Sequence, residues 1–173
     1  MDLRINDRII LQPGRFNAMI APPGLFLKGI NDNPVIGRYT TLLIGGNFSR
    51  LLNGITRTSG TFEIRRSFTV HQLLTILRED DHSIVIVEHD PTLYEDAGDA
   101  KRVVPPTMKE RSRNALLVLY APAMDPSFAY LAHTADHLWY YDDGSAAADP
   151  GPGNYAVSRG RTAGSPNPQR TLF

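Results

Sequence analysis

The sequence contains no cysteine, and this absence excludes disulfide-stabilised folds, thiolate zinc sites and cysteine nucleophiles. It also lacks an excess of either charge, because 18 basic residues balance 18 acidic ones. No net field therefore draws the chain to a nucleic-acid backbone, and any DNA contact must come from a local patch. No apolar run approaches the roughly 18 residues of a membrane span, and residues 1–14 contain no apolar signal core. We expect no membrane partner and a cytoplasmic location.

The composition divides the chain near Asp143. A length of 173 residues with 42% hydrophobic and 21% charged residues is ordinary for one globular domain. Residues 144–168 are mostly Gly, Ala, Ser and Pro, and such a stretch cannot bury enough surface to offset the entropy of ordering it. Residues 169–173 become apolar again. The sequence thus predicts a domain over 1–143, a disordered, flexible linker over 144–168 and a terminal peptide over 169–173.

Apolar runs and helical patterns alternate before this boundary. Strands are predicted over residues 15–21, 40–44, 62–65, 83–87, 115–120 and 137–141. Helices are predicted over 48–55, 69–79, 107–113 and 127–136. The second helix has Thr69 as its N-cap and a buried stripe of Val70, Leu73, Leu74 and Leu77. Strands that alternate with helices indicate an α/β domain, with a mainly parallel sheet flanked by helices in three layers.

Three segments of this pattern carry a family resemblance. They are Leu42-Leu43-Ile44-Gly45-Gly46-Asn47-Phe48, Arg66-Ser67-Phe68-Thr69-Val70-His71-Gln72-Leu73-Leu74 and Ile84-Val85-Ile86-Val87-Glu88-His89-Asp90. In their order they resemble the ATPase core of the RecA/RadA recombinases, over residues 15–142. The resemblance implies a RecA-like fold of the P-loop NTPase type and makes Glu88, His89 and Asp90 the Walker-B-like segment.

The departures from that family concern the residues that handle ATP. A P-loop needs G-x-x-x-x-G-K-[ST], and no Gly-Lys-Thr/Ser occurs in this chain. The first strand is followed instead by residues 21–28, in which Pro22 and Pro23 remove backbone donors. The family's catalytic Glu is replaced within Gly45-Gly46-Asn47. The resemblance therefore implies a non-catalytic relative, a pseudo-ATPase without a cofactor.

The terminal peptide Gln169-Arg170-Thr171-Leu172-Phe173 resembles the archaeal form of the peptide that binds PCNA-type sliding clamps. In that resemblance Gln169 occupies a small polar pocket and Leu172 a hydrophobic one, while Thr171 and Phe173 complete the pattern. The final aromatic pair of the family is missing. A flexible linker lets such a short peptide reach its groove. The style of the peptide suggests an archaeal source.

Two further groups of residues are weighed as sites. The segment 101–113 lies where the family places DNA-binding loops, and its basic residues are Lys101, Arg102, Lys109, Arg111 and Arg113. A solvated surface helix explains them equally well, and the segment has no interleaved aromatics. His133 and His137 have a spacing that can hold one metal ion, although two surface histidines are the simpler interpretation. For residues 88–90, a vestige or a loop-organising role is favoured over cation binding.

Together these observations predict an accessory protein of DNA repair, recombination or replication rather than an enzyme. Its body would contact another RecA-fold protein, a polymerase or DNA, and its tail would tether it to the clamp. Two alternatives stay open. One is a divergent NTPase that uses Glu88 and an unusual phosphate loop over residues 22–28; the other is a metal-dependent hydrolase built on His89, Asp90, His133 and His137.

Overall fold

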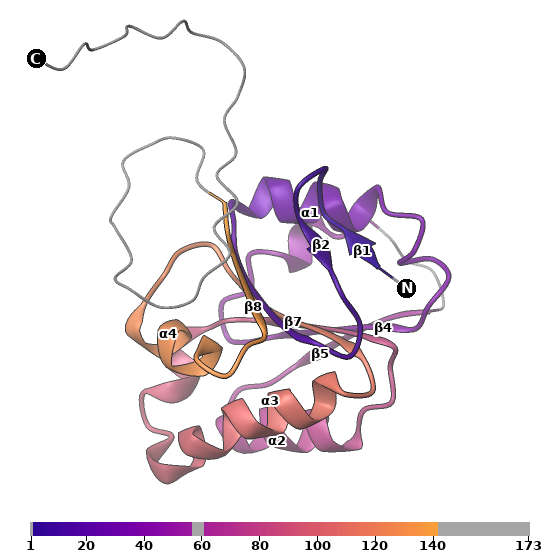
Figure 1. The fold of residues 1–173 in the computed structure, drawn as a ribbon. Coiled ribbons are helices and arrows are strands. Elements are labelled where there is room, and N and C mark those ends of the chain that lie inside the picture. Colours follow the sequence, from indigo (N-terminus) through magenta and orange to yellow (C-terminus); the bar gives the residue numbers. More distant parts are fainter. Residues whose placement is uncertain (1, 57–60, 142–173) are drawn as a thin grey trace, which may run out of the picture.

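The computed structural model describes residues 2–56 and 61–141, and its centre is a six-stranded sheet (Figure 1). The strands stand in the order β5-β4-β6-β7-β3-β8, and every neighbouring pair is parallel. Their bounds are β3 Phe16–Ile20, β4 Thr41–Gly45, β5 Phe62–Arg66, β6 Ile84–Glu88, β7 Leu116–Ala121 and β8 His137–Tyr140. The predicted α/β class with a parallel sheet is confirmed.

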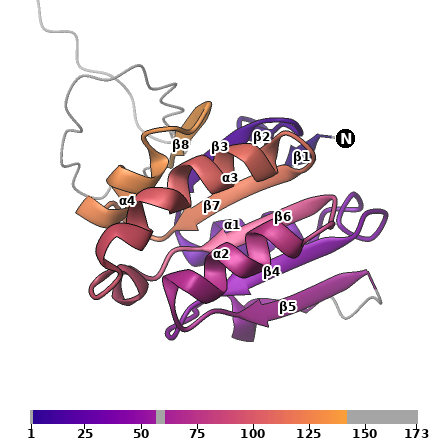
Figure 2. The same cartoon turned by 90° about the horizontal axis from the view of Figure 1, so that it is seen from below.

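Helices cover both faces of this sheet, which gives the expected three layers. Helix α1 (Pro23–Asn31) and the antiparallel hairpin of β1 (Leu3–Arg4) and β2 (Ile10–Leu11) lie on one face (Figure 1). Helices α2 (Val70–Glu79) and α3 (Val104–Ser112) lie side by side on the other, as Figure 2 shows from below. Helix α4 (Pro126–Ala132) contacts α3 and packs into the same layer.

The sheet separates two hydrophobic cores because successive side chains of a strand point to opposite faces. In β7, Leu117 and Leu119 pack toward α2, α3 and α4, whereas Val118 and Tyr120 pack toward α1 and the hairpin. Strand β6 is also buried over its whole length. Nearly continuous apolar runs are what a strand covered on both faces requires.

Helix α2 follows the local signals of its sequence. The hydroxyl of Thr69 accepts a hydrogen bond from the backbone N–H of Gln72 at 3.2 Å, so Thr69 is the N-cap. The Gln72 side chain in turn accepts the N–H of Phe68 at 2.7 Å. All four residues of the predicted stripe are buried. Helix α3 starts earlier than predicted because Pro105 and Pro106 are compatible with a first helical turn.

Three other sequence-based expectations differ from the structure. The helix predicted over 48–55 is absent apart from a short 3₁₀ turn, η1 (Leu52–Gly54), whose hydrogen bonds are described with the site below. Helix α1 was not predicted, because the Pro-Pro-Gly at its start was interpreted only as the end of a strand. Helix α4 ends at Ala132 instead of Asp136, whose carboxylate accepts the N–H of Phe16 at 2.8 Å and fixes the start of β3.

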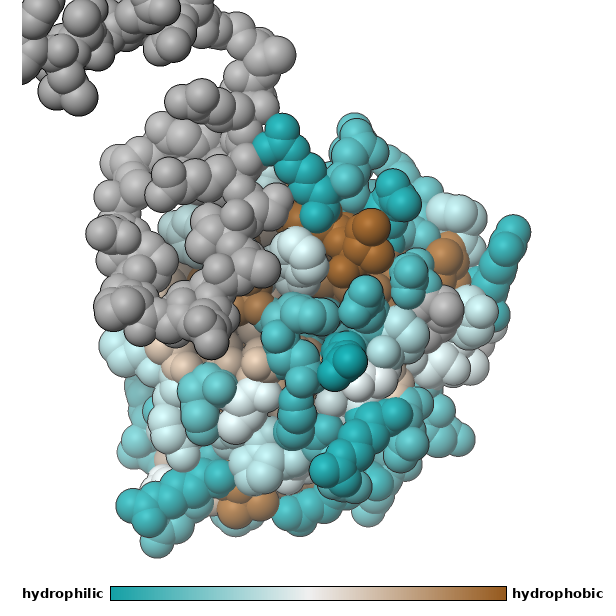
Figure 3. All heavy atoms as spheres, viewed as in Figure 1, coloured by the Kyte–Doolittle hydropathy of each residue, from teal (hydrophilic) through white to brown (hydrophobic). Residues whose placement is uncertain are grey.

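The face of the molecule in Figure 3 is mainly hydrophilic, with hydrophobic residues confined to separate areas. Within residues 2–56 and 61–141, no helix has the length and apolar character that crossing a membrane demands.

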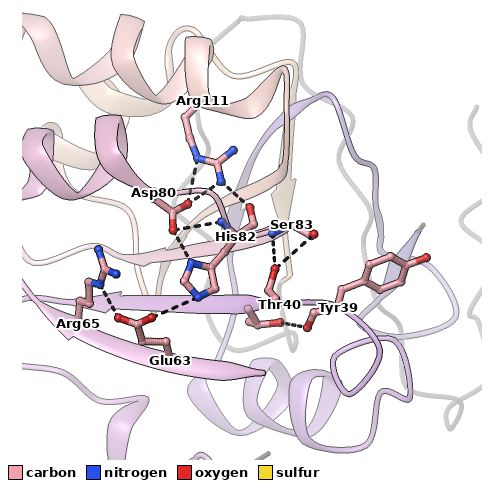
Figure 4. A network of polar contacts seen from close by, with 9 residues as sticks. Tyr39, Thr40, Glu63, Arg65, Asp80, His82, Ser83 and Arg111 are labelled. Atoms are coloured by element: carbon pink, nitrogen blue, oxygen red, sulfur yellow. Dashed lines mark hydrogen bonds and ion pairs between the residues drawn. The ribbon is translucent and has the colours of Figure 1, made fainter. Parts of the chain in front are cut away.

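A polar network joins the strands at their amino-terminal ends, opposite to the carboxyl ends where the candidate site lies (Figure 4). Arg111 donates through Nε and Nη2 to the buried carboxylate of Asp80, at 3.0 and 2.6 Å, and also to the carbonyl oxygen of His82. The imidazole of His82 lies 2.6 Å from Asp80 and 3.4 Å from Glu63. The network thereby connects α2, α3, β5 and the start of β6.

This network yields a stability prediction. Replacing Arg111 with leucine leaves the buried Asp80 carboxylate without its cation, so we expect the free energy of unfolding to fall by about 3 kcal/mol. The matched control is Arg113→Leu, which removes only an exposed pair with Glu110 and should cost less than about 0.5 kcal/mol. Urea denaturation measures both. Equal losses in the two variants would contradict the structural role of Arg111.

Candidate functional site

The site lies at the carboxyl edge of the parallel sheet, where the chain leaves neighbouring strands toward opposite faces. After β4 the chain turns to the face of α1, where Leu51 is buried. After β6 it turns to the other face, where Leu93 and Tyr94 of the 3₁₀ turn η2 (Pro91–Tyr94) are buried. Such a reversal leaves a crevice beyond the strand ends, and open α/β sheets bind their ligands there.

A cavity of about 290 Å³ occupies this crevice. Its floor is formed by the residues that end β6, and its walls by the loops after β4 and β7. The wall residues are both apolar and charged, among them Phe48, Arg50, Met124 and Asp125. The three strand ends that meet here are separated by up to 75 residues in the sequence, yet parallel pairing puts them at one edge.

Glu88, the last residue of β6, points its carboxylate into the loop after β4. One oxygen accepts the backbone N–H groups of Arg50 and Leu51, at 2.6 and 3.2 Å, and the other accepts the hydroxyl of Ser49. The side chain is 3% exposed. Burial raises the pKa of Glu88 above its usual value, while these three donors act in the opposite direction.

Asp90 holds the same loop from a second point. It accepts the N–H of Phe48 at 3.0 Å, and the N–H and hydroxyl of Thr92 at 3.0 and 2.7 Å. Burial alone would raise the pKa of Asp90, but the hydrogen bonds from Phe48, Thr92 and the Asn47 amide hold it below its usual value. Gly46 is required here, since an added Cβ would lie 2.5 Å from Asp90.

The hydrogen bonds of residues 48–55 show how this segment departs from the predicted helix. The N–H groups of Phe48, Arg50 and Leu51 donate to the carboxylates of Glu88 and Asp90, but the first N–H groups of a helix lack a carbonyl partner within it, so these contacts alone do not exclude a helix. Helical-type bonds are formed by Gly54 and Ile55, whose N–H groups donate to the carbonyl oxygen of Leu51 at 2.9 and 3.2 Å, and they make a single turn. The N–H of Leu52 then donates to the Ser49 hydroxyl at 3.2 Å, which starts the short 3₁₀ turn.

His89 lies between Glu88 and Asp90 but points away from the loop. Its Nε2 is 2.8 Å from a carboxylate oxygen of Asp125, and its ring stacks on Tyr94 at 5.6 Å and meets the edge of Phe128. Burial lowers the pKa of His89, against the attraction of Asp125. The lowered pKa favours the neutral imidazole near pH 7, and the side chain joins β6 to α4, whose N-cap is Asp125.

The place expected for the phosphate loop is filled by packing. Only Ala21 and Pro22 separate β3 from α1. The N–H groups of Leu25 and Phe26 donate to the carbonyl oxygen of Pro22, and Pro23 has none to offer. Beneath this turn the rings of Phe26 and Tyr120 stack at 4.2 Å, and the Tyr120 hydroxyl donates to the Ala21 carbonyl at 2.9 Å. A nest of free N–H groups cannot form with this geometry.

The five basic residues of segment 101–113 each have a partner. Lys101 of the 3₁₀ helix η3 (Gly98–Val103) lies over the rings of Tyr94 and Tyr130, at 5.8 and 5.3 Å. The other four form ion pairs: Arg102 with Asp99, Lys109 with Asp136, Arg111 with Asp80 and Arg113 with Glu110. The structure does not gather these cations into a free basic surface.

The remaining predicted sites are the histidine pair His133 and His137 and the C-terminal peptide. The imidazole Nδ1 of His133 donates to the carbonyl oxygen of Tyr130, and His137 begins β8, so the two imidazoles belong to separate elements. In the described part of the chain, the cluster with metal-ligand spacing is Asp80, Asp81 and His82 instead. The clamp-binding residues Gln169, Thr171, Leu172 and Phe173 lie outside the described residues, as does the linker over 144–168.

Sequence reasoning missed two residues of this site. Asp125 and Ser49 carry no motif, and they come next to the segment 88–90 only through the parallel pairing of β4, β6 and β7. The one available signal for Asp125 was an Asp-Pro before a helical pattern, which is typical of an N-cap.

The chain thus forms an α/β domain with a small crevice at the point where the connections after β4 and β6 leave toward opposite faces of the sheet. No family model matches the chain. The chain is similar to an uncharacterized protein of Archaeoglobus fulgidus, with 32% identity over 124 residues. This alignment covers 71% of the chain and 63% of the relative's length.

The buried His89 predicts a pH dependence of stability. The unfolded chain binds a proton to this histidine near pH 6.5, whereas the folded protein binds it only at lower pH. In that window the unfolded state holds more protons, so stability falls as the pH falls. Each unit of pKa difference is worth about 1.4 kcal/mol.

We expect His89→Phe to lose less stability than the wild type between about pH 7.5 and about pH 5.5. Urea denaturation at both pH values measures the difference. The exposed His71, replaced with glutamine, provides the control and should leave the pH dependence unchanged. An identical pH dependence in wild type and His89→Phe would contradict the assignment of a neutral buried histidine.

Proposed function

We propose that this protein is a non-catalytic, RecA/RadA-like accessory protein of DNA repair, recombination or replication. It acts in the cytoplasm of an archaeon, where its C-terminal peptide tethers it to a PCNA-type sliding clamp. The observation that carries the non-catalytic part is the use of Glu88 and Asp90. Their carboxylates accept hydrogen bonds from the loop after β4 and from Thr92, so they serve as loop anchors.

The turn after β3 supports the same proposal. Nucleotide binding by this class of fold depends on N–H groups that surround the phosphates and on a lysine for their charge. Here two prolines start α1, and the N–H groups of Leu25 and Phe26 are already bonded to Pro22. The family core therefore acts as a scaffold in this proposal, and partner binding replaces hydrolysis.

The enzyme alternatives receive less support from the geometry. A divergent NTPase needs Glu88 to face Mg²⁺ or water, but its oxygens face Ser49, Arg50 and Leu51. A hydrolase metal site needs His89 to share an ion with other ligands, whereas its Nε2 is committed to Asp125. The arrangement favours an interaction module over either enzyme.

The tethering part of the proposal rests on the peptide Gln169–Phe173. A short motif behind a linker that the sequence predicts to be flexible would raise the local concentration of the body at the clamp, so that a weak contact of the body becomes effective. The body would then meet another RecA-fold protein, a polymerase or DNA at the replication or repair site.

Calorimetric titration of an archaeal PCNA-type clamp with the full-length protein tests the proposal. We expect low-micromolar binding that weakens at least about tenfold in Leu172→Ala, because that side chain would lose its hydrophobic pocket. The matched control Arg170→Ala changes a position that the resemblance leaves free, and its affinity should equal that of the wild type. Binding that survives Leu172→Ala, or no binding at all, would overturn the tethering proposal.

A further inference from the structure

Two exposed phenylalanines project from the corner of the sheet where β4 and β5 end. Phe48 is 75% exposed and Phe68 is 53% exposed, the two highest values among the large hydrophobic side chains of the described residues. Ile64 of β5, 45% exposed, is the next. A single exposed apolar residue needs no explanation, but aromatic side chains held in water at one corner indicate a contact surface.

The loop that presents Phe48 is held rigidly from below. Its own N–H donates to Asp90, and two residues later the N–H of Arg50 donates to Glu88. Both acceptors are buried carboxylates at the end of β6. The aromatic side chain is thus displayed by an ordered backbone, and a preorganised side chain loses little entropy when it binds.

Arg66 joins the two aromatic residues. Its Nη2 donates to the carbonyl oxygens of Gly46 and Asn47, at 3.2 and 2.9 Å, directly before Phe48. The same guanidinium lies 5.5 Å from the centre of the Phe68 ring. Register explains this contact, because Arg66 is paired with Gly45 across β4 and β5.

The surface is basic as well as aromatic. Arg50 and Arg66 are both exposed, and among the described residues neither forms an ion pair with a carboxylate. The acids nearby, Glu88 and Asp90, are buried and engaged with the loop. This corner therefore differs from segment 101–113, where four of the five cations are paired with acids.

We infer that Phe48, Arg50, Arg66 and Phe68 form a binding site for single-stranded nucleic acid, here named the aromatic corner. Bases stack on exposed aromatic rings, and arginines contact the phosphates between them. A protein partner would be expected to bring acids to Arg50 and Arg66; a nucleic acid brings both the charge and the flat rings. This inference rests on the proposed function, since it gives the body of the accessory protein its own ligand.

Fluorescence anisotropy of a labelled thymidine oligomer of about 16 nucleotides, titrated with the full-length protein, tests the inference. A uridine oligomer of equal length separates DNA from RNA as the source of the ligand. We expect Phe48→Leu to weaken binding about tenfold, because leucine keeps an apolar side chain but offers no ring for stacking. Phe48→Trp should bind at least as well as the wild type.

Arg50 is tested through the salt dependence. Its backbone N–H binds Glu88, so Arg50→Gln keeps the loop and removes only the charge of the side chain. The slope of log affinity against log salt should fall by about 0.7, the value for one phosphate contact on a single strand. Arg78→Gln on α2 is the matched control for Arg50→Gln, and Tyr39→Leu is the matched control for Phe48→Leu. Both controls are at exposed positions away from this corner.

The outcomes separate the inference from its rivals. Equal affinity of wild type and Phe48→Leu, or no binding to either oligomer, overturns it. Loss of binding in Arg113→Gln with retention in Phe48→Leu would assign the contact to segment 101–113 and overturn it too. A protein that binds the clamp but neither oligomer retains the proposed function without the aromatic corner. A protein that binds an oligomer through Phe48 but does not bind the clamp retains the nucleic-acid site at the aromatic corner, and the tethering proposal is then wrong.

Discussion

The arrangement of this protein depends on two buried carboxylates at the end of one central strand. Glu88 and Asp90 accept backbone N–H groups from the loop after β4, and these bonds decide the path of that loop. Because the bonds are made to buried charged acceptors, they are worth more than ordinary hydrogen bonds. The loop in turn forms one wall of the crevice and displays Phe48. The same two carboxylates therefore hold the loop in place and position the exposed Phe48.

Within the proposed function, the same interaction accounts for a RecA-like fold that is kept without a catalytic role. The acids at the end of the Walker-B-like strand are costly to bury without partners. In this chain the loop after β4 supplies those partners. Pro22 and Pro23 close the turn after β3, which supports the proposed use of the carboxyl edge of the sheet as a contact surface.

The sequence was sufficient for the elements whose local signals agree with their packing. Helix α2 has a Thr69 cap and an apolar stripe at helical spacing, and both are as predicted. The helix predicted over residues 48–55 is reduced to one turn: Glu88 and Asp90, 38 to 42 residues away, hold the loop before it, and the N–H of Leu52 donates to the Ser49 hydroxyl; no local pattern reveals these contacts. Helix α1 was missed because prolines in the first turn of a helix cannot be distinguished in the sequence from prolines that end a strand.

The candidate site was predictable only in part, for a similar reason. The segment Glu88–Asp90 was found because it follows an apolar strand, and parallel sheets place functional groups there. The placement of Phe48 and Phe68 at one corner of the sheet depends on the register between β4 and β5, which periodicity alone does not fix. Cations in segment 101–113 were visible in the sequence, but their ion-pair partners come from distant elements.

Amide hydrogen exchange at Phe48, Arg50 and Leu51 tests most directly whether the two carboxylates anchor this loop. We predict that the three amides are protected in the free protein, that Glu88→Gln lowers the protection of Arg50 and Leu51 more than that of Phe48, and that Mg²⁺ with ATP changes none of them. Amides that exchange freely without ligand and become protected with Mg²⁺ and ATP would contradict the account, because the carboxylates would then serve a nucleotide site.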